Sequence, residues 1–232
     1  MLTRRDLVLY GLVILTPTAP YPVFGIVQQN SGGHAALAYA VAMVAMFFTA
    51  SSYAKMASVF PSAGSTYTYA HRGINAHAGF LAGWAMILDY FLIPLLSVIY
   101  ASLTAERLFP YVPNWIWACI FTLAITAVNL RGIRMTARAS AWLMGIMTGC
   151  AILFICLSVR FVVLQHGWAG LFNIEGVFRP GAFSMPLLLS GAGIATLSYI
   201  GFDAISTLAE DALDPERDIG WATIAVCVFQ GL

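Results

Sequence analysis

The stretch between Ser184 and Asp211 combines an apolar composition with groups that do not suit a lipid-facing helix. It is long enough to cross a bilayer as a helix, which takes about 20 apolar residues. It also holds three glycines, which loosen helical backbone, and, well before the two acids at its end, the carboxylate Asp203. A carboxylate within hydrocarbon is costly unless its helix lines a polar cavity. The stretch therefore predicts either a broken helix that binds a small ligand near mid-membrane, or a buried helix whose aspartate contacts neighbouring helices.

The first apolar segment, from about Leu7 to Val27, is predicted to be broken as well. Residues 16–22 read TPTAPYP, and each of the three prolines removes an amide donor and clashes with the preceding turn of a helix. We expect exposed backbone groups around Thr16–Tyr21 in this segment and around Ser198–Gly201 in the later one. Exposed amides at the start of a half-helix suit anions, whereas exposed carbonyls suit cations and ammonium groups.

Two carboxylates, Asp89 and Asp203, lie inside predicted membrane spans that contain no basic residue. Each therefore needs a cation, a proton or a network of hydrogen bonds. Asp89 has the alternative that serine, threonine or backbone groups of neighbouring helices satisfy it. Tyr90, Tyr199 and Phe202 offer aromatic faces to an alkylammonium group, or alternatively they pack between helices.

An acidic run follows the apolar stretch and includes Glu210, Asp211, Asp214, Glu216 and Asp218. Acidic residues at a helix C-terminus oppose the helix dipole, so they need partners. Arg131, Arg134 and Arg138 are candidates, and a solvated run is the alternative. We place the first two acids of the run at the cytoplasmic end, in a position to act in gating.

The composition is that of a helical integral membrane protein. The 232 residues are 60% hydrophobic and 9% charged, with a mean hydropathy of +0.84, whereas a soluble domain has about 25% charged residues. The apolar runs are continuous and lack the alternation of outer-membrane strands. A net charge of +1 gives no indication of a nucleic-acid partner. The four cysteines have no metal or redox spacing, and no phosphate loop, Gly-x-Ser-x-Gly or His–Glu pair occurs, so we predict no enzyme, metal or cofactor.

Six complete spans are predicted, at about residues 7–27, 35–53, 78–103, 113–130, 139–164 and 184–211. A seventh apolar run starts near Trp221 and reaches only about 18 Å as a helix, less than the roughly 30 Å of a bilayer core. The chain is therefore expected to be truncated. The missing helices would leave the small residues 190–195 against lipid or a partner chain. Of the 11 Lys and Arg residues, all but Arg107, Arg160 and Arg179 fall on the same side as the N-terminus, which predicts a cytoplasmic N-terminus.

Four segments resemble known membrane transporters. FPSAGSTYTY at 60–69 resembles the turn after the second helix of the amino acid–polyamine–organocation permeases. SYIGFDAISTLAEDALDPERDI at 198–219 resembles their sixth helix and the loop after it. GIVQQNSGGH at 25–34 and GWAMILDYFLIPL at 83–95 most resemble the bacterial putrescine-importer-type members. The resemblance covers the whole chain but only the first half of the family architecture.

The resemblance implies an all-α LeuT-like fold with two inverted five-helix repeats in a single transmembrane domain, residues 1–232. The first repeat would span about 7–165, an external loop about 166–181, and the start of the second repeat about 184–232. It also implies a secondary transporter of the inner membrane that imports an amine-bearing small molecule such as putrescine or an amino acid. Coupling to protons is favoured over sodium, and whether the carrier is a homodimer stays open.

By position, the family's substrate contacts fall on the two breaks and on the third span, at Thr16, Pro17, Tyr21, Asp89, Tyr90, Ser198, Tyr199, Gly201, Phe202 and Asp203. Many relatives have a glycine-rich first break that receives an α-carboxylate, and TPTAPYP in its place favours a diamine. The putrescine-type members carry an acidic residue near Pro22, which this chain lacks, and the fifth span lacks the lysine that some relatives use as a proton switch. A permease for neutral or cationic amino acids and a non-transporting truncated module stay open as alternatives.

Overall fold

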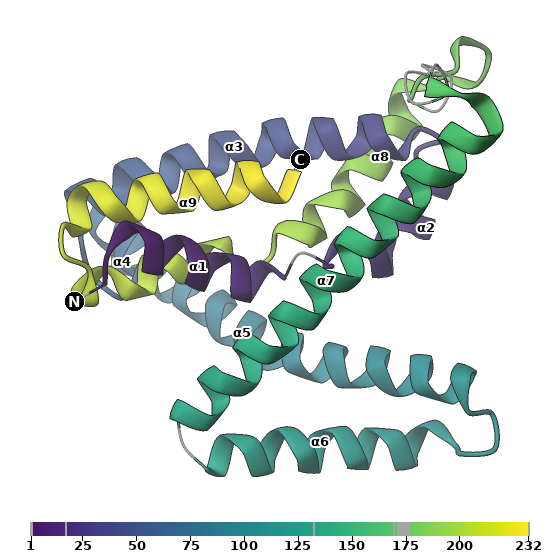
Figure 1. Ribbon diagram of the computed structural model, residues 1–232. Coiled ribbons are helices and arrows are strands. Elements are labelled where there is room, and N and C mark those ends of the chain that lie inside the picture. The colour runs from purple at the N-terminus through teal and green to yellow at the C-terminus, as the bar shows by residue number, and fades with distance from the viewer. Residues whose placement is uncertain (1, 17, 132, 169, 171–176, 232) are drawn as a thin grey trace. The chain divides into compact units, whose positions relative to one another are not determined.

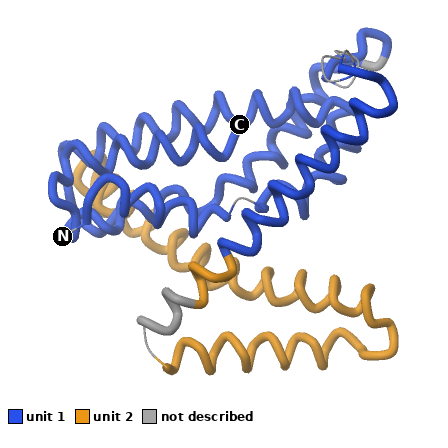
Figure 2. Tube along the Cα trace, viewed as in Figure 1, with its two compact units in different colours: residues 1–65, 144–232 blue, residues 66–143 orange. Residues whose placement is uncertain are grey.

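The computed structural model describes residues 2–16, 18–131, 133–168, 170 and 177–231 (Figure 1). In that part of the chain the regular elements are helices, with one isolated bridge between Leu2 and Ala212. The chain divides into two compact units, one formed by residues 1–65 and 144–232 and the other by residues 66–143 (Figure 2).

Two long helices, α3 (Ala35–Val59) and α9 (Pro215–Gly231), lie side by side in the first unit (Figure 1). They approach closely because small residues line the contact: a Cβ added to Gly220 would lie 2.8 Å from the Cβ of Ala54. The buried residues of α3 are also small, namely Ala35, Ala38, Ala42, Ala50 and Ala57. Small residues let membrane helices gain van der Waals contact and bring their backbones together. The last helix begins at Pro215, ahead of the predicted apolar run.

Helix α1 (Arg4–Leu15) begins with a capping box, which fixes its start. The Asp6 amide donates to the Thr3 hydroxyl over 3.4 Å, and the Thr3 amide donates to the Asp6 carboxylate over 2.9 Å. These two bonds satisfy backbone donors that a helix start leaves without partners. The capping residues thus define where the first span begins.

The N-terminal residues also form hydrogen bonds and an ion pair with the segment around the start of α9. The Leu2 amide donates to the Asp211 carbonyl over 2.7 Å, and the Leu2 carbonyl accepts from the Leu213 amide over 3.0 Å. The Arg4 guanidinium forms an ion pair with the buried carboxylate of Asp218. A buried carboxylate needs such a partner, because burial without one is costly.

Two acids of the run have partners other than those predicted, whereas Asp211, Asp214 and Glu216 are exposed, as the solvated alternative describes. Asp218 pairs with Arg4, and the carboxylate of Glu210 accepts from the Ala63 amide over 3.2 Å. Of the predicted partners, Arg131 belongs to the second unit, and the side chains of Arg134 and Arg138 lie outside the described part of the chain.

Helix α2 (Pro20–Asn30) packs against α8 (Met185–Ala195). A Cβ added to Gly191 would lie 2.7 Å from the Cβ of Ser31, so only glycine fits at this contact. Ala192 and Ala195 are buried on the same helix. The expectation that this small-residue face lies against lipid or a partner chain is therefore wrong for these three residues, which are buried within the chain.

The second unit contains α5 (Ala76–Leu108) and α6 (Asn114–Leu130), which pack against each other as a hairpin. Asn75 caps α5 by accepting the Ala78 amide at 2.8 Å, and the helix continues through its internal Pro94. The short helix α4 (Ser65–Gly73), from residue 66 on, also belongs to this unit.

Four helical segments of the described residues are long and apolar enough to cross a membrane: Ala35–Val59, Ala76–Leu108, the Ala139–His166 part of α7 (Ile133–His166), and Met185–Asp211. The bent pair of α1 and α2 counts as a fifth if the two helices form one span. The remaining predicted span is α6, which has 17 residues and is shorter than these candidates. The cytoplasmic location of the N-terminus stays a prediction.

His34 joins the segment before α8 to the start of α3. The ring is 1% exposed, with Nδ1 3.1 Å from the Ser31 carbonyl oxygen and Nε2 3.2 Å from the Arg179 amide. Because a carbonyl only accepts and an amide only donates, these contacts require the tautomer with hydrogen on Nδ1. The Phe178 and Phe183 rings lie 6.0 and 5.7 Å from the imidazole, centroid to centroid.

We predict that His34→Phe lowers the free energy of unfolding by roughly 1–3 kcal/mol, because it keeps a buried ring but removes both hydrogen bonds. His77→Phe is the control, since His77 is exposed. Thermal unfolding in detergent measures both variants. Equal melting temperatures for His34→Phe and the unaltered protein would show that the two hydrogen bonds contribute nothing.

Candidate functional site

The first break is present between α1 and α2. Helix α1 ends at Leu15, α2 begins at Pro20, and their axes differ by 60°. Thr16 adopts a φ of 54°, which β-branched residues rarely do. Pro17 lies outside the described residues. The prediction that residues 16–22 interrupt the first span is confirmed.

Side chains from two other helices contact the backbone at this break. The Tyr39 hydroxyl, from α3, donates to the Pro20 carbonyl over 3.2 Å. The Gln230 amide, from α9, donates to the Thr16 carbonyl over 3.4 Å. Sequence reasoning missed both residues, although a glutamine at the end of an apolar run is a polar signal that could have been used. They hold the opened backbone in place because they supply hydrogen bonds that a regular helix would otherwise provide.

The second break follows α8. A 3₁₀ turn, η4 (Thr196–Tyr199), leads to Gly201 with a φ of 105°, and a longer 3₁₀ segment, η5 (Phe202–Asp211), continues the chain. Among the common residues, glycine alone adopts such a φ readily. The predicted break at residues 198–201 is confirmed, and the chain beyond it is wound more tightly than an α-helix.

The two breaks meet in the first unit. A Cβ added to Gly201 would lie 2.7 Å from Cγ2 of Ile14, in the last turn of α1. The last carbonyls of a helix have no partner within the helix, and they carry the negative end of its dipole. The second break therefore lies beside the end of α1, where the local field favours a cation.

Buried hydroxyl groups lie next to this contact. Ser198 is 2% exposed and Tyr199 is 1% exposed, and the Ser198 hydroxyl has no hydrogen-bond partner among the described residues. The Tyr199 hydroxyl has no hydrogen-bond partner among the described residues, and it lies beside α9, where a Cβ on Gly231 would come within 2.7 Å. Buried polar groups are nearly always hydrogen-bonded, so this hydroxyl is a candidate donor to a ligand.

Two predicted aromatic contacts pack against protein. Phe202 is 7% exposed, and its ring meets that of Tyr53 edge to face at 5.1 Å. Tyr21 is half exposed and meets Phe154 edge to face at 5.7 Å. For Phe202 this is the arrangement that the helix-packing alternative describes. Asp203 lies two residues after Gly201 and is partly exposed.

The other predicted site residues lie elsewhere in the chain. Asp89 and Tyr90 are on α5 in the second unit, and 46% of Tyr90 is exposed. Glu210 and Asp211 lie at the end of η5, where both accept hydrogen bonds from backbone amides. A role of these two acids in gating stays a prediction.

Comparison with known proteins identifies the family. The family model described as amino acid permease matches residues 22–231. This chain belongs to the amino acid permease family. The permease is 34% identical to the low-affinity putrescine importer PlaP of Escherichia coli over 231 residues, which is 100% of the chain and 51% of the relative. No solved structure matches the chain.

Two further relatives widen the range of substrates named in the family. The permease is 28% identical to the vacuolar cationic amino acid transporter 4 of Arabidopsis thaliana, covering 98% of the chain and 41% of that protein. It is 26% identical to the branched-chain amino acid permease BcaP of Bacillus subtilis, covering 92% of the chain and 48% of that protein. The chain spans about half the length of the curated relatives it matches. Its relatives are transport permeases and not enzymes, and its apolar helices make it a multi-pass membrane protein.

Gly201→Ala should destabilise the first unit by about 1–3 kcal/mol, because alanine at a φ of 105° is strained and its Cβ would clash with Ile14. Gly193→Ala is the matched control, since a Cβ there meets no atom within 4 Å and alanine favours the helix. Thermal unfolding compares the two variants. A melting temperature for Gly201→Ala at or above that of Gly193→Ala would contradict the close approach of the breaks.

Proposed function

We propose that the permease is a secondary active transporter that imports an amine-bearing small molecule, which binds at the two breaks. The contact of Gly201 with Ile14 carries the proposal, because it brings together two interrupted helices of one bundle. In transporters with inverted repeats, substrates bind where two discontinuous helices face each other near the bilayer midplane. The proposal includes a LeuT-like fold with two inverted repeats, a location in the inner membrane and an N-terminus in the cytoplasm.

The charges around the breaks favour an amine over an acid. The end of α1 presents carbonyl groups, and Asp203 adds a carboxylate close to Gly201. The side chains that donate hydrogen bonds to the first break, Tyr39 and Gln230, are uncharged. The relatives named for putrescine and for cationic amino acids support a cationic substrate. The relative named for branched-chain amino acids keeps a neutral amino acid as the second candidate.

The residues of the site have distinct proposed roles. Thr16 and Ser198 present backbone groups to the substrate, and Pro17, next to Thr16 in the sequence, is a further proposed substrate-binding residue. The hydroxyl of Tyr199, which has no partner among the described residues, donates a hydrogen bond to it. Asp203 neutralises the substrate ammonium or takes the coupled proton.

Other predicted site residues have proposed roles as well. Tyr21 and Tyr90 offer aromatic faces to the ammonium, and Asp89 adds a second intramembrane carboxylate. Glu210 and Asp211 gate the cytoplasmic end. Protons are the proposed coupling ion.

Asp203→Asn tests the proposed role of the carboxylate. The change keeps the shape of the side chain and removes its charge, so we expect uptake to be abolished while membrane insertion is retained. Asp214→Asn is the control, since Asp214 is exposed in the turn before α9. The measurement is uptake of labelled putrescine, lysine and leucine by cells that express the protein. Near-normal uptake of any of the three by Asp203→Asn would assign this aspartate to structure.

Substrate competition tests the preference for a diamine. Putrescine should compete for uptake better than leucine, because the TPTAPYP break offers no glycine-rich cradle for a carboxylate. Tyr90→Ala should weaken binding about 2- to 30-fold, the range expected from loss of a cation–π contact. Tyr111→Ala is its control, as Tyr111 is 99% exposed. Strong competition by leucine and none by putrescine would establish the neutral amino-acid alternative instead.

A further inference from the structure

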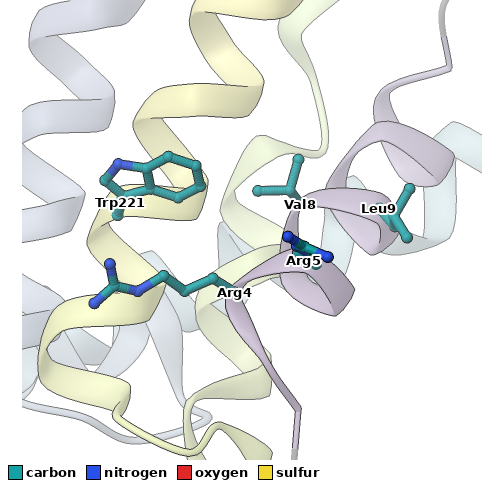
Figure 3. A pocket seen from close by; sticks show the side chains of 5 residues that line it. All are labelled: Arg4, Arg5, Val8, Leu9 and Trp221. Atoms are coloured by element: carbon teal, nitrogen blue, oxygen red, sulfur yellow. The ribbon is translucent and has the colours of Figure 1, made fainter.

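A groove of about 480 Å³ lies between α1 and α9, away from the helix breaks. Its lining residues are Arg4, Arg5, Val8, Leu9 and Trp221. Figure 3 shows the Arg4 side chain reaching from α1 toward α9, below Trp221 in this view. We refer to these five residues as the α1–α9 groove.

The groove contains one arginine in an ion pair and, among the described residues, one without, and its lining is therefore positively charged. Arg4 is fixed by its ion pair with Asp218 on α9. Arg5 is exposed and forms no ion pair with any described residue. None of the five lining residues is acidic. A cationic substrate would be repelled here, so the groove does not suit the amine that we propose for the breaks.

The apolar side chains that line the groove are at least partly exposed. Leu9 and Trp221 are each 53% exposed, and Val8 is the third apolar residue of the lining. The arginines stand in the first turn of α1, at the edge of the first apolar span, and the apolar residues follow within that span. Arginines at the end of a membrane span, beside exposed apolar residues that include a tryptophan, complement a phospholipid. Such a lipid combines a charged headgroup with apolar acyl chains.

We propose that the α1–α9 groove binds an anionic phospholipid. The headgroup phosphate accepts hydrogen bonds from Arg5 and, beside its ion pair, from Arg4. One acyl chain lies along Val8, Leu9 and the indole of Trp221. Arginine suits this role because its planar guanidinium can donate two parallel hydrogen bonds to a phosphate.

The proposed lipid site does not depend on which substrate is transported. It nevertheless involves α1, whose last turn contacts the second break. Helix α1 carries the groove at its start and the contact with Gly201 in its last turn. A lipid bound at the start therefore fixes the end of α1 that lies farthest from the break. Because binding of lipid is the readout, failure of the transport proposal would leave this one standing, and the reverse holds as well.

The test uses the purified permease in detergent with an equimolar mixture of phosphatidylglycerol and phosphatidylcholine of identical acyl chains. Native mass spectrometry counts the lipids of each kind that stay bound. The unaltered protein should retain phosphatidylglycerol in preference. Arg5→Gln should lower this preference about five-fold, the effect expected for one basic residue at an anionic membrane surface.

Two further variants sharpen the result. Arg5→Lys keeps the charge and should retain most of the preference, whereas Arg217→Gln removes an exposed arginine of α9 outside the groove and should leave it unchanged. Equal retention of the two lipids by the unaltered protein would overturn the proposal, and that result needs no variant to fold. Loss of the preference in Arg217→Gln but not in Arg5→Gln would also overturn it.

Discussion

The close approach of Gly201 to Ile14 is the constraint on which the rest of the first unit depends. A side chain at residue 201 would have to occupy space that Ile14 already fills, and the local φ of 105° suits glycine alone. The approach brings the second break against the last turn of α1, and four residues separate the end of α1 from the start of α2. Two interrupted helices can share a binding site only if they come into contact. Here the contact is possible because Gly201 has no side chain.

An opened helix needs new partners for its backbone, and the scaffold of α3 and α9 supplies them. Tyr39 reaches Pro20 from α3, and Gln230 reaches Thr16 from α9. The two scaffold helices hold these side chains in position because they pack tightly through Gly220 and Ala54. The geometry of the break thus depends on a helix contact that involves none of the residues proposed to bind substrate.

Local chemistry made much of this arrangement predictable. Proline in TPTAPYP and glycine at 201 act on their own backbone, so the sequence alone indicates where the helices are interrupted. The family was also evident from residues 60–69 and 198–219. The contacts that complete the site were not predicted, because they join distant parts of the chain: Thr16 and Gln230 are separated by 214 residues. The ion pair of Arg4 with Asp218 was not predicted for the same reason. Arginines closer to Asp218 in the sequence were expected as its partners.

Cysteine cross-linking measures the meeting of the two breaks most directly. Ile14→Cys and Gly201→Cys are introduced together into a chain whose four native cysteines are replaced by alanine, and membranes are treated with a mild oxidant. The pair Ser65→Cys and Ser206→Cys, whose native hydroxyl oxygens lie 2.7 Å apart, is the positive control. If the breaks meet, both pairs form a disulfide, which requires Cβ atoms roughly 3.5–4.5 Å apart. A disulfide in the control pair and none between residues 14 and 201 would contradict the account.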